Sequence, residues 1–274
     1  MIQKVFYFPQ IFPIFQEAHD FFVNTKKQTA TQHLFTNKQL RTLLVPIMVE
    51  QLLSSLMGTA DTMMVSNVGS AAISAVSLVD AINILVIQAL SALAAGGAIL
   101  CSQYLGSQNL KKAKRSAEQV LFVMLVLSCS LSLLCLIFRF PLLRLIFGTV
   151  DTDVMANSQI YFFFTLLSFP FIGLYDAGAS ILRAQNTKGP MTISILSNFL
   201  NIGGNAILIF VFGMGVAGAA ISTLVSRIFC AIVVIWQLRN PAEQIYVRNY
   251  FSIRPDWSLI KRVLFIGIPS GIEN

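Results

Sequence analysis

Charged residues are scarce in this sequence. Asp, Glu, Lys and Arg make up 11% of its 274 residues, whereas soluble domains carry about 25%. Hydrophobic residues make up 55%, and the mean hydropathy is +0.73. This balance excludes an ordinary soluble domain and predicts an all-α polytopic membrane protein. The net charge of +7 does not indicate nucleic acid as a partner, because the basic residues lie in short loops between apolar segments.

Histidine and cysteine are also rare. His19 and His33 both precede the first long apolar segment, so no imidazole remains in the membrane for a Ser-His-Asp triad or a histidine-based metal site. The sequence contains neither HExxH nor GxSxG, and its four cysteines lack C-x-x-C spacing. The cysteines are therefore interpreted as packing residues. We expect neither an enzyme nor a bound cofactor.

The apolar segments predict a six-helix transmembrane lobe followed by the start of a seventh helix. We expect the spans at 43–65, 73–104, 117–138, 158–182, 191–212 and 216–238. The expected organisation is an amino-terminal cytoplasmic or interfacial segment at 1–39, the lobe at 40–238, a cytoplasmic loop at 239–256, and a truncated seventh helix at 257–274. On this interpretation the chain is the first half of a longer protein.

Lysines and arginines predict the orientation of these spans. They gather before the first span and after the second, fourth and sixth, whereas the loops at the other end contain only Arg139 and Arg144. Cytoplasmic loops are the ones enriched in Lys and Arg. We therefore expect a multi-pass protein of the cell membrane, embedded in the lipid bilayer, with a cytoplasmic amino terminus.

The first span, LLVPIMVEQLLSSLMGTADTMMV, carries two acids, Glu50 and Asp61. They lie about three helical turns apart and so share one face. A carboxylate is costly at membrane depth and should face protein or water. The acids therefore either line a pathway for ions or cationic solutes or are satisfied by neighbouring helices for packing alone.

Three further polar residues match Asp61 in depth. With the orientation above, Asn201, Asn205 and Thr223 lie in the outer half of their spans, within about 10 Å of Asp61 along the membrane normal. One carboxylate with amide and hydroxyl oxygens is a set of hard ligands suited to Na⁺. Alternatively, the carboxylate alone carries a proton, because burial disfavours its charged form. Asn198, Asn201 and Asn205, spaced at i, i+3 and i+7, could equally join helices through hydrogen bonds.

Other acids within the spans are candidates for a substrate or proton pathway. Glu50 and Asp176 match in depth in the inner half and could share a proton. Asp80 lies in the second span and Glu273 in the start of the seventh. Ionisable residues at such depth are functional candidates by default.

Several stretches resemble the multidrug and toxic compound extrusion (MATE) family. PIMVEQLLSSLMGTADTMMVSNVGSAAISAVSL is similar to its first helix, and ALAAGGAILCSQYLGSQNLKKAKR to its second helix and following loop. ASILRAQNTKGPMTISILSNFLNIGGNAILI and GMGVAGAAISTLVSR resemble helices four to six, and IGIPSGIE the start of helix seven. The resemblance covers about residues 40–274.

This resemblance implies twelve helices in two lobes and efflux of cationic, amphiphilic drugs in exchange for H⁺ or Na⁺. Asp61 matches the family's cation-binding carboxylate, and Asn201 and Thr223 match its polar partners. One branch of the family has a second Asp at the position of Asn205. Glu273 matches the acid of helix seven, which is associated with the carboxyl-terminal lobe.

We therefore expect an antiporter whose partners are small cationic substrates and a missing carboxyl-terminal lobe. The alternatives are a lipid-linked-sugar flippase of a related superfamily and a non-transporting membrane interaction partner. A flippase would favour cationic grooves for pyrophosphate, whereas this chain places acids inside its spans.

Overall fold

The computed structural model describes residues 37–148, 150–185, 188–241, 243–248 and 255–273. The chain divides into two units, Met1–Leu44 and Val45–Asn274. Only the start of one helix is described in the first unit, so the account below concerns the second. The interfacial segment expected at 1–39 lies almost entirely outside the described residues.

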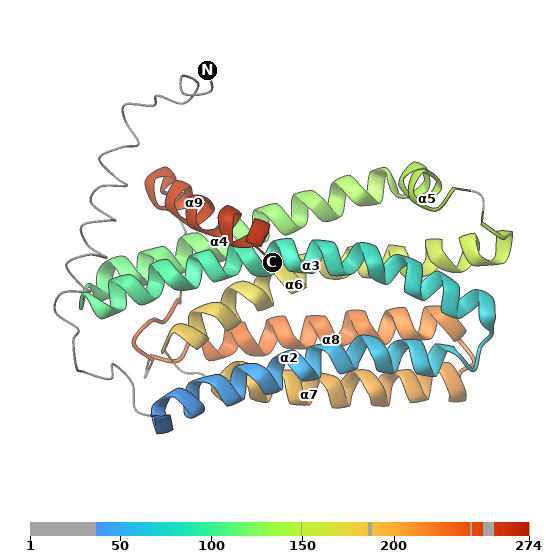
Figure 1. Cartoon of the computed structure of the whole chain (residues 1–274), viewed down its shortest axis with the longest axis horizontal. Helices are drawn as coiled ribbons and strands as arrows, with labels where there is room; N and C mark the ends of the chain where they lie inside the picture. Colours follow the sequence, from blue (N-terminus) through green and yellow to red (C-terminus); the bar gives the residue numbers. More distant parts are fainter. Residues whose placement is uncertain (1–36, 149, 186–187, 242, 249–254, 274) are drawn as a thin grey trace, which may run out of the picture. The chain divides into compact units, whose positions relative to one another are not determined.

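The described residues form helices and no strands (Figure 1). In chain order they are α2 (Asn37–Val65), α3 (Ser70–Gly106), α4 (Leu110–Ile137), α5 (Arg139–Phe147), α6 (Thr152–Gln185), α7 (Lys188–Asn205), the π-helix η1 (Ala206–Val211), α8 (Gly215–Gln237) and α9 (Trp257–Glu273).

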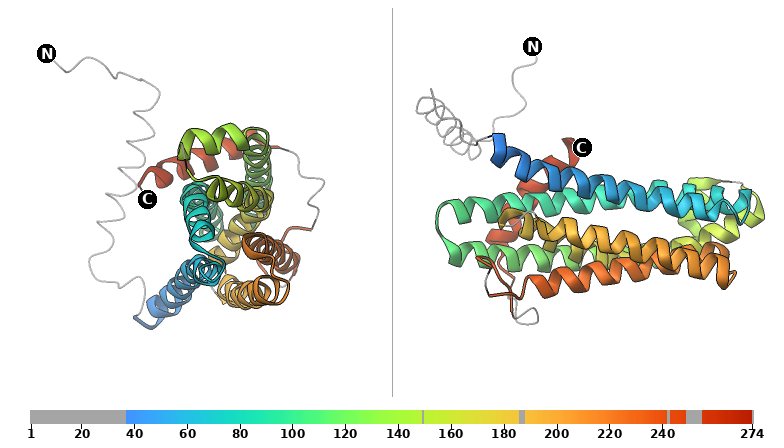
Figure 2. Two further views of the ribbon diagram at one scale, coloured as in Figure 1. Left: turned by 90° about the vertical axis from the view of Figure 1, so that its right-hand side faces the viewer. Right: turned by 90° about the horizontal axis from the view of Figure 1, so that it is seen from below.

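The long helices of the second unit run side by side, and successive helices reverse direction (Figure 1). The turns after α2 and η1 lie at one end, together with α5; we name this the Val68 end. The turn after α3, the end of α6, the start of α7 and the end of α8 lie at the other, which we name the Gln108 end. Helix α5 lies across the bundle instead of along it (Figure 2).

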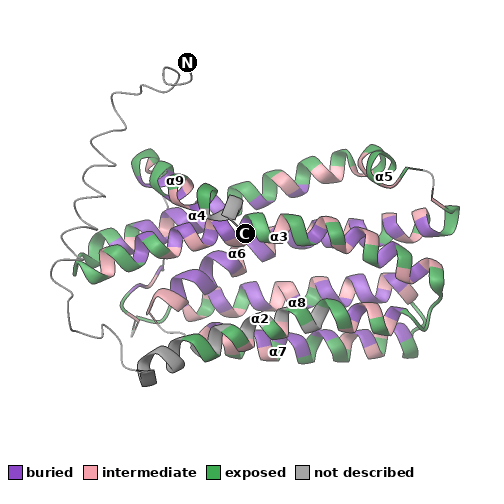
Figure 3. Ribbon diagram, in the orientation of Figure 1, coloured by how far each residue is buried: buried purple, intermediate pink, exposed green. Residues whose placement is uncertain are grey.

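Helix α6 lies at the centre of the lobe and packs against α3, α4 and α8. Its aromatic residues Tyr161, Phe162 and Phe169 are fully buried, and buried residues lie on the facing sides of the central helices (Figure 3). A Cβ at Gly173 would lie 2.6 Å from Ser128 Oγ on α4. The absence of a side chain at Gly173 therefore lets α4 and α6 approach closely, as small residues do between membrane helices.

Five described segments are long and apolar enough to cross a membrane: Ser70–Gly106, Leu110–Ile137, Thr152–Gln185, Gly189–Val211 and Gly215–Gln237. They correspond to the second to sixth expected spans. Helix α2 contains the first expected span but is not among the five. The described residues thus contain five candidate spans where six were expected. The all-α polytopic membrane fold predicted from composition is confirmed.

Helix boundaries differ from the sequence expectation at one connection. The segment after the third span was expected only to join two helices, but it forms the short helix α5. Pro141 lies in the first turn of α5, where a missing N–H breaks no helical hydrogen bond. Arg144 lies in its last turn, where a positive charge interacts favourably with the helix dipole.

Candidate functional site

Asp61 is the acid at the centre of the candidate site. It lies on the last full turn of α2, and its side chain is only 2% exposed. Asn205 Nδ2 donates a hydrogen bond to Asp61 Oδ1 over 2.5 Å, and Thr223 Oγ1 donates to Asp61 Oδ2 over 2.7 Å. Each carboxylate oxygen therefore receives one neutral donor, from the end of α7 and from α8 respectively.

Further hydrogen bonds hold α7 and α8 together around this carboxylate. Asn201 Nδ2 donates to Thr223 Oγ1 over 3.2 Å, and Ser222 Oγ donates to the backbone oxygen of Asn201 over 2.8 Å. Gly204 leaves room for Ser222, whose hydroxyl would collide with a Cβ at that position. The structure thus brings together Asp61 and its three partners expected from the sequence, while their role in binding a cation remains a prediction.

Two amide oxygens in the site lack donors. Asn201 Oδ1 and Asn205 Oδ1 are buried and accept no hydrogen bond within the described structure. Buried acceptors without a donor are uncommon, because each forfeits its hydration. Together with the Asp61 carboxylate they leave a group of oxygens with unused capacity to bind a positive charge.

A π-helical segment begins directly after Asn205. In η1 the backbone follows i→i+5 hydrogen bonding, and Phe212 N donates to Ile207 O over 3.0 Å. Such segments are rare and are frequently found at functional sites. The apolar sequence of η1, AILIFV, contains no feature that distinguishes a π turn from an α turn, so the sequence could not predict this segment.

Asp80 forms a second polar cluster on the neighbouring helices. Its Oδ1 accepts hydrogen bonds from Asn83 Nδ2 and from Tyr161 Oη, both over 3.2 Å. Asp80 also interacts electrostatically with Asp61. Tyr161 was missed from the sequence, although a tyrosine within an apolar span needs a partner for its hydroxyl.

Arg227 is a basic residue inside the expected sixth span, 216–238, where the sequence alone indicates no partner for it. In the structure it is half-buried on α8, and its Nη1 donates to Ser168 Oγ on α6 over 2.6 Å. The guanidinium group therefore points into the lobe between α6 and α8.

The remaining acids predicted from the sequence lie apart from this site or outside the description. Asp176 is buried and accepts a hydrogen bond from Ser91 Oγ over 3.0 Å. The side chains of Glu50 and Glu273 lie outside the described residues, so the structure does not test a Glu50–Asp176 pair. Asn198 bonds back to Ser194 O on its own helix and so does not join helices.

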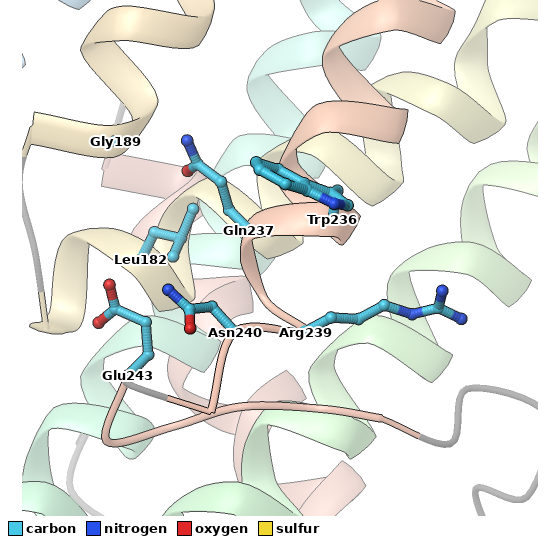
Figure 4. Close-up of a pocket in the computed structure, with 7 residues that line it drawn as sticks. All are labelled: Leu182, Gly189, Trp236, Gln237, Arg239, Asn240 and Glu243. Atoms are coloured by element: carbon cyan, nitrogen blue, oxygen red, sulfur yellow. The ribbon is translucent and has the colours of Figure 1, made fainter.

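A hollow of the described structure lies away from this cluster, at the Gln108 end. It has a volume of about 560 Å³ and is lined by side chains that include Trp236, Gln237 and Glu243 (Figure 4). The side chain of Arg239 extends away from Glu243 (Figure 4). This hollow shares no residue with the Asp61 cluster and contains no buried acid, so its chemistry does not support it as the main site.

The Gln108 end is held by polar contacts of a different kind. Gln185 bonds both to Ile245 N, over 2.7 Å, and to Ile245 O, over 2.9 Å. Arg115 forms an ion pair with Asp256 at 2.9 Å. The hydrogen bond from Ser258 Oγ, with Arg115 as a smaller cause, holds the pKa of Asp256 below its ordinary value.

Comparison with known proteins places the chain in a family. The MatE family model matches residues 46–207, more than half of the chain. Over 236 residues the chain is 31% identical to the transporter YisQ of Bacillus subtilis, covering 84% of this chain and 51% of YisQ. It is 29% identical over 250 residues to the probable multidrug resistance protein NorM of Thermotoga maritima, and this match covers 86% of this chain and 51% of NorM.

The fold also matches solved structures. A crystal structure of MATE in the bent conformation superposes with a TM-score of 0.78 at 24% identity, covering 85% of this chain and 52% of that one. The chain thus spans about half the length of the proteins it matches. Members of this family are transporters and not enzymes. Its family model, relatives and fold together establish that the chain belongs to the MatE family of multidrug and toxic compound extrusion transporters.

Proposed function

We propose that this chain forms one lobe of a secondary transporter that exports cationic, amphiphilic drugs or toxic compounds in exchange for H⁺ or Na⁺. Asp61 binds the coupling cation, and Asn201, Asn205 and Thr223 complete its site. Of the other acids in the spans, Glu50, Asp80 and Glu273 belong to the pathway of the proton or substrate.

One observation carries this proposal: a buried carboxylate with two neutral donors beside two buried amide oxygens that accept no hydrogen bond. Among the described residues, no Lys or Arg forms an ion pair with Asp61. A buried charge is costly unless it is paired or binds a cation. A small monovalent cation supplies the missing charge and also satisfies the amide oxygens.

The same oxygens suit either coupling ion. Na⁺ would be held by Asp61 together with Asn201 Oδ1, Asn205 Oδ1 and Thr223 Oγ1, since hard cations prefer oxygen ligands. A proton would instead convert Asp61 into a donor. The Thr223 hydroxyl can rotate to accept the hydrogen bond from protonated Asp61. The Asn205 amide can also accept it if its oxygen turns toward Asp61.

Transport requires more than one lobe in this proposal. Transporters built from repeats bind substrate between two halves that rock against each other. The described lobe provides one wall and one cation site. A second lobe of similar size is consistent with the chain spanning about half of its relatives. We further propose that the Val68 end faces the outside, because basic residues gather at the Gln108 end.

The test is transport in vesicles. The chain is reconstituted alone and together with the carboxyl-terminal half of NorM, and export of a cationic dye is driven by an imposed H⁺ or Na⁺ gradient. We expect export by the pair under one of the gradients and none by the chain alone. An assembled pair that exports no dye under either gradient would overturn the proposal.

A further inference from the structure

Arg227 is a basic side chain in the middle of a membrane-spanning helix. It lies twelve positions after Gly215, the first residue of α8, which is about 18 Å along the helix axis. A charged residue at such depth is costly and normally pairs with another charge or faces a polar cavity. Arg227 Nη1 donates a hydrogen bond to the neutral hydroxyl of Ser168, so the charge itself must be balanced by other groups.

Helix geometry directs Arg227 toward both acidic clusters. Thr223, which bonds to Asp61, lies one turn earlier on the same face of α8, since residues four apart are neighbours. On α6, Ser168 lies two turns from Tyr161 and on the same face, and Tyr161 bonds to Asp80. The guanidinium of Arg227 thus occupies the space between helices that also holds the partners of Asp61 and Asp80.

The three charges act on one another. Asp61 interacts electrostatically with Asp80 and with Arg227, and Asp80 interacts with Arg227. None of the three forms an ion pair with another among the described residues, so the interactions act across a gap. We call the region that holds the side chains of Asp61, Asp80 and Arg227 the compartment. Its two carboxylates and one guanidinium give it one net negative charge.

We propose that Arg227 fixes the charge of this compartment, so that it binds one monovalent cation and rejects divalent cations. Arg227 offsets the charge of Asp80 and leaves that of Asp61 for the transported ion. This inference rests on the proposed role of Asp61 in binding a cation. It makes Arg227 a specificity-determining residue, although it need not touch the ion.

Electrostatics explains the selectivity. Charges interact far more strongly in a protein interior than in water, so one extra negative charge strongly favours a divalent ion. The oxygens of the compartment are of the kind that Ca²⁺ takes as ligands. Without Arg227 the compartment would carry two negative charges beside those oxygens. The structure therefore predicts a gain of Ca²⁺ binding when the guanidinium is removed.

The experiment uses four versions of the purified chain in detergent: wild type, Arg227→Gln, Arg227→Lys, and the double variant Arg227→Gln with Asp80→Asn. Radioactive Ca²⁺ retained on the protein is measured at constant ionic strength. We expect Arg227→Gln to bind Ca²⁺ at least roughly tenfold more tightly than wild type. Arg227→Lys keeps the charge, and the double variant restores one net negative charge, so both should behave as wild type.

A gain of Ca²⁺ binding cannot result from general damage to the fold, which only removes sites. A folded Arg227→Gln variant without that gain would overturn the inference, and so would an equal gain in the double variant. If Arg227→Gln does not fold, Asp80→Asn serves instead: it should weaken binding of the monovalent ion roughly tenfold, and the double variant should restore it. Unchanged binding in Asp80→Asn would contradict the inference. Failure of the proposed function is recognised separately, as unchanged H⁺ and Na⁺ binding in Asp61→Asn.

Discussion

Two polar clusters, one toward each end of the lobe, differ in how their hydrogen-bonding groups are paired. At the Gln108 end, Gln185 satisfies both backbone groups of Ile245, and Asp256 is paired with Arg115. Toward the Val68 end, Asp61 receives only neutral donors, and amide oxygens beside it accept nothing. The Gln185 and Asp256 contacts are made within the protein, whereas the cluster around Asp61 keeps amide oxygens that no described residue satisfies.

This difference separates structural polar groups from functional ones. A membrane acid is not by itself informative, because Asp176 is also buried and has a donor in Ser91. What distinguishes Asp61 is the group of acceptors without donors around it. Each such acceptor costs free energy while it lacks a donor, and in the proposed function a bound cation would offset this cost.

The largest effect on transport is expected from a substitution at Asp61. Asp61→Asn, in the chain assembled with a second lobe, should abolish ion-driven dye export, because an amide carries no charge to exchange. Expression should stay near normal, since Asn keeps the shape and one acceptor oxygen. Asp176→Asn is the matched control and should retain most of the export. Wild-type export by Asp61→Asn would refute the assignment.

Which end faces outward can be tested by an all-or-none measurement. In a background without the four native cysteines, single cysteines at Asn67 and Gly213 should react with an impermeant maleimide added to intact cells. A cysteine at Gln108 should react only after permeabilisation, because the basic Gln108 end is expected in the cytoplasm. The reverse pattern would invert the proposed orientation.

A smaller effect, on stability, is expected at the Gln108 end. Gln185→Ala removes two hydrogen bonds to Ile245 and leaves partly buried backbone groups unpaired, which should lower the free energy of unfolding by about 1–3 kcal/mol. Denaturant unfolding in detergent measures this. The Gln237 side chain forms no hydrogen bond among the described residues, so Gln237→Ala is the matched control and should cost less than about 0.5 kcal/mol. Equal losses in both variants would show that the Gln185 contacts stabilise nothing.

The smallest effect concerns Asp256, whose pKa is lowered in the folded chain mainly by Ser258. A lowered pKa adds stability above the unfolded value, about 3.9, and this contribution disappears as the pH falls through the folded value. Asp256→Asn should therefore melt slightly below wild type at neutral pH, and the difference should shrink below about pH 4. A difference that grows as the pH falls would contradict this sign.

Much of the fold follows from the sequence because membrane helices obey a simple rule of length and hydropathy. The expected spans coincide with α3, α4, α6, α7 with η1, and α8, and α2 contains the first. Several helices exceed the predicted spans because their ends continue beyond the apolar segment. Helix α4, for example, begins at Leu110 after the cap Asn109, whose side chain accepts a hydrogen bond from Lys112 N. The short helix α5 was missed because its nine residues are too few for a periodic signal.

The site was predictable in part. Depth and residue type were enough to group Asp61 with Asn201, Asn205 and Thr223, because the turns between spans are short. Helical depth says nothing of rotation about the axis, so the link from Tyr161 to Asp80 and the direction of Arg227 required coordinates. The π turns of η1 depend on packing against α8, which no local pattern encodes.

The most direct test of the cation site is to count the ions that bind to the purified chain. Retained radioactive Na⁺ and protons taken up from a weakly buffered solution are measured for wild type, Asp61→Asn and Asp176→Asn. The account predicts about one monovalent cation per chain in wild type and in Asp176→Asn, and its loss in Asp61→Asn. Equal binding of Na⁺ and protons by Asp61→Asn and wild type would contradict it.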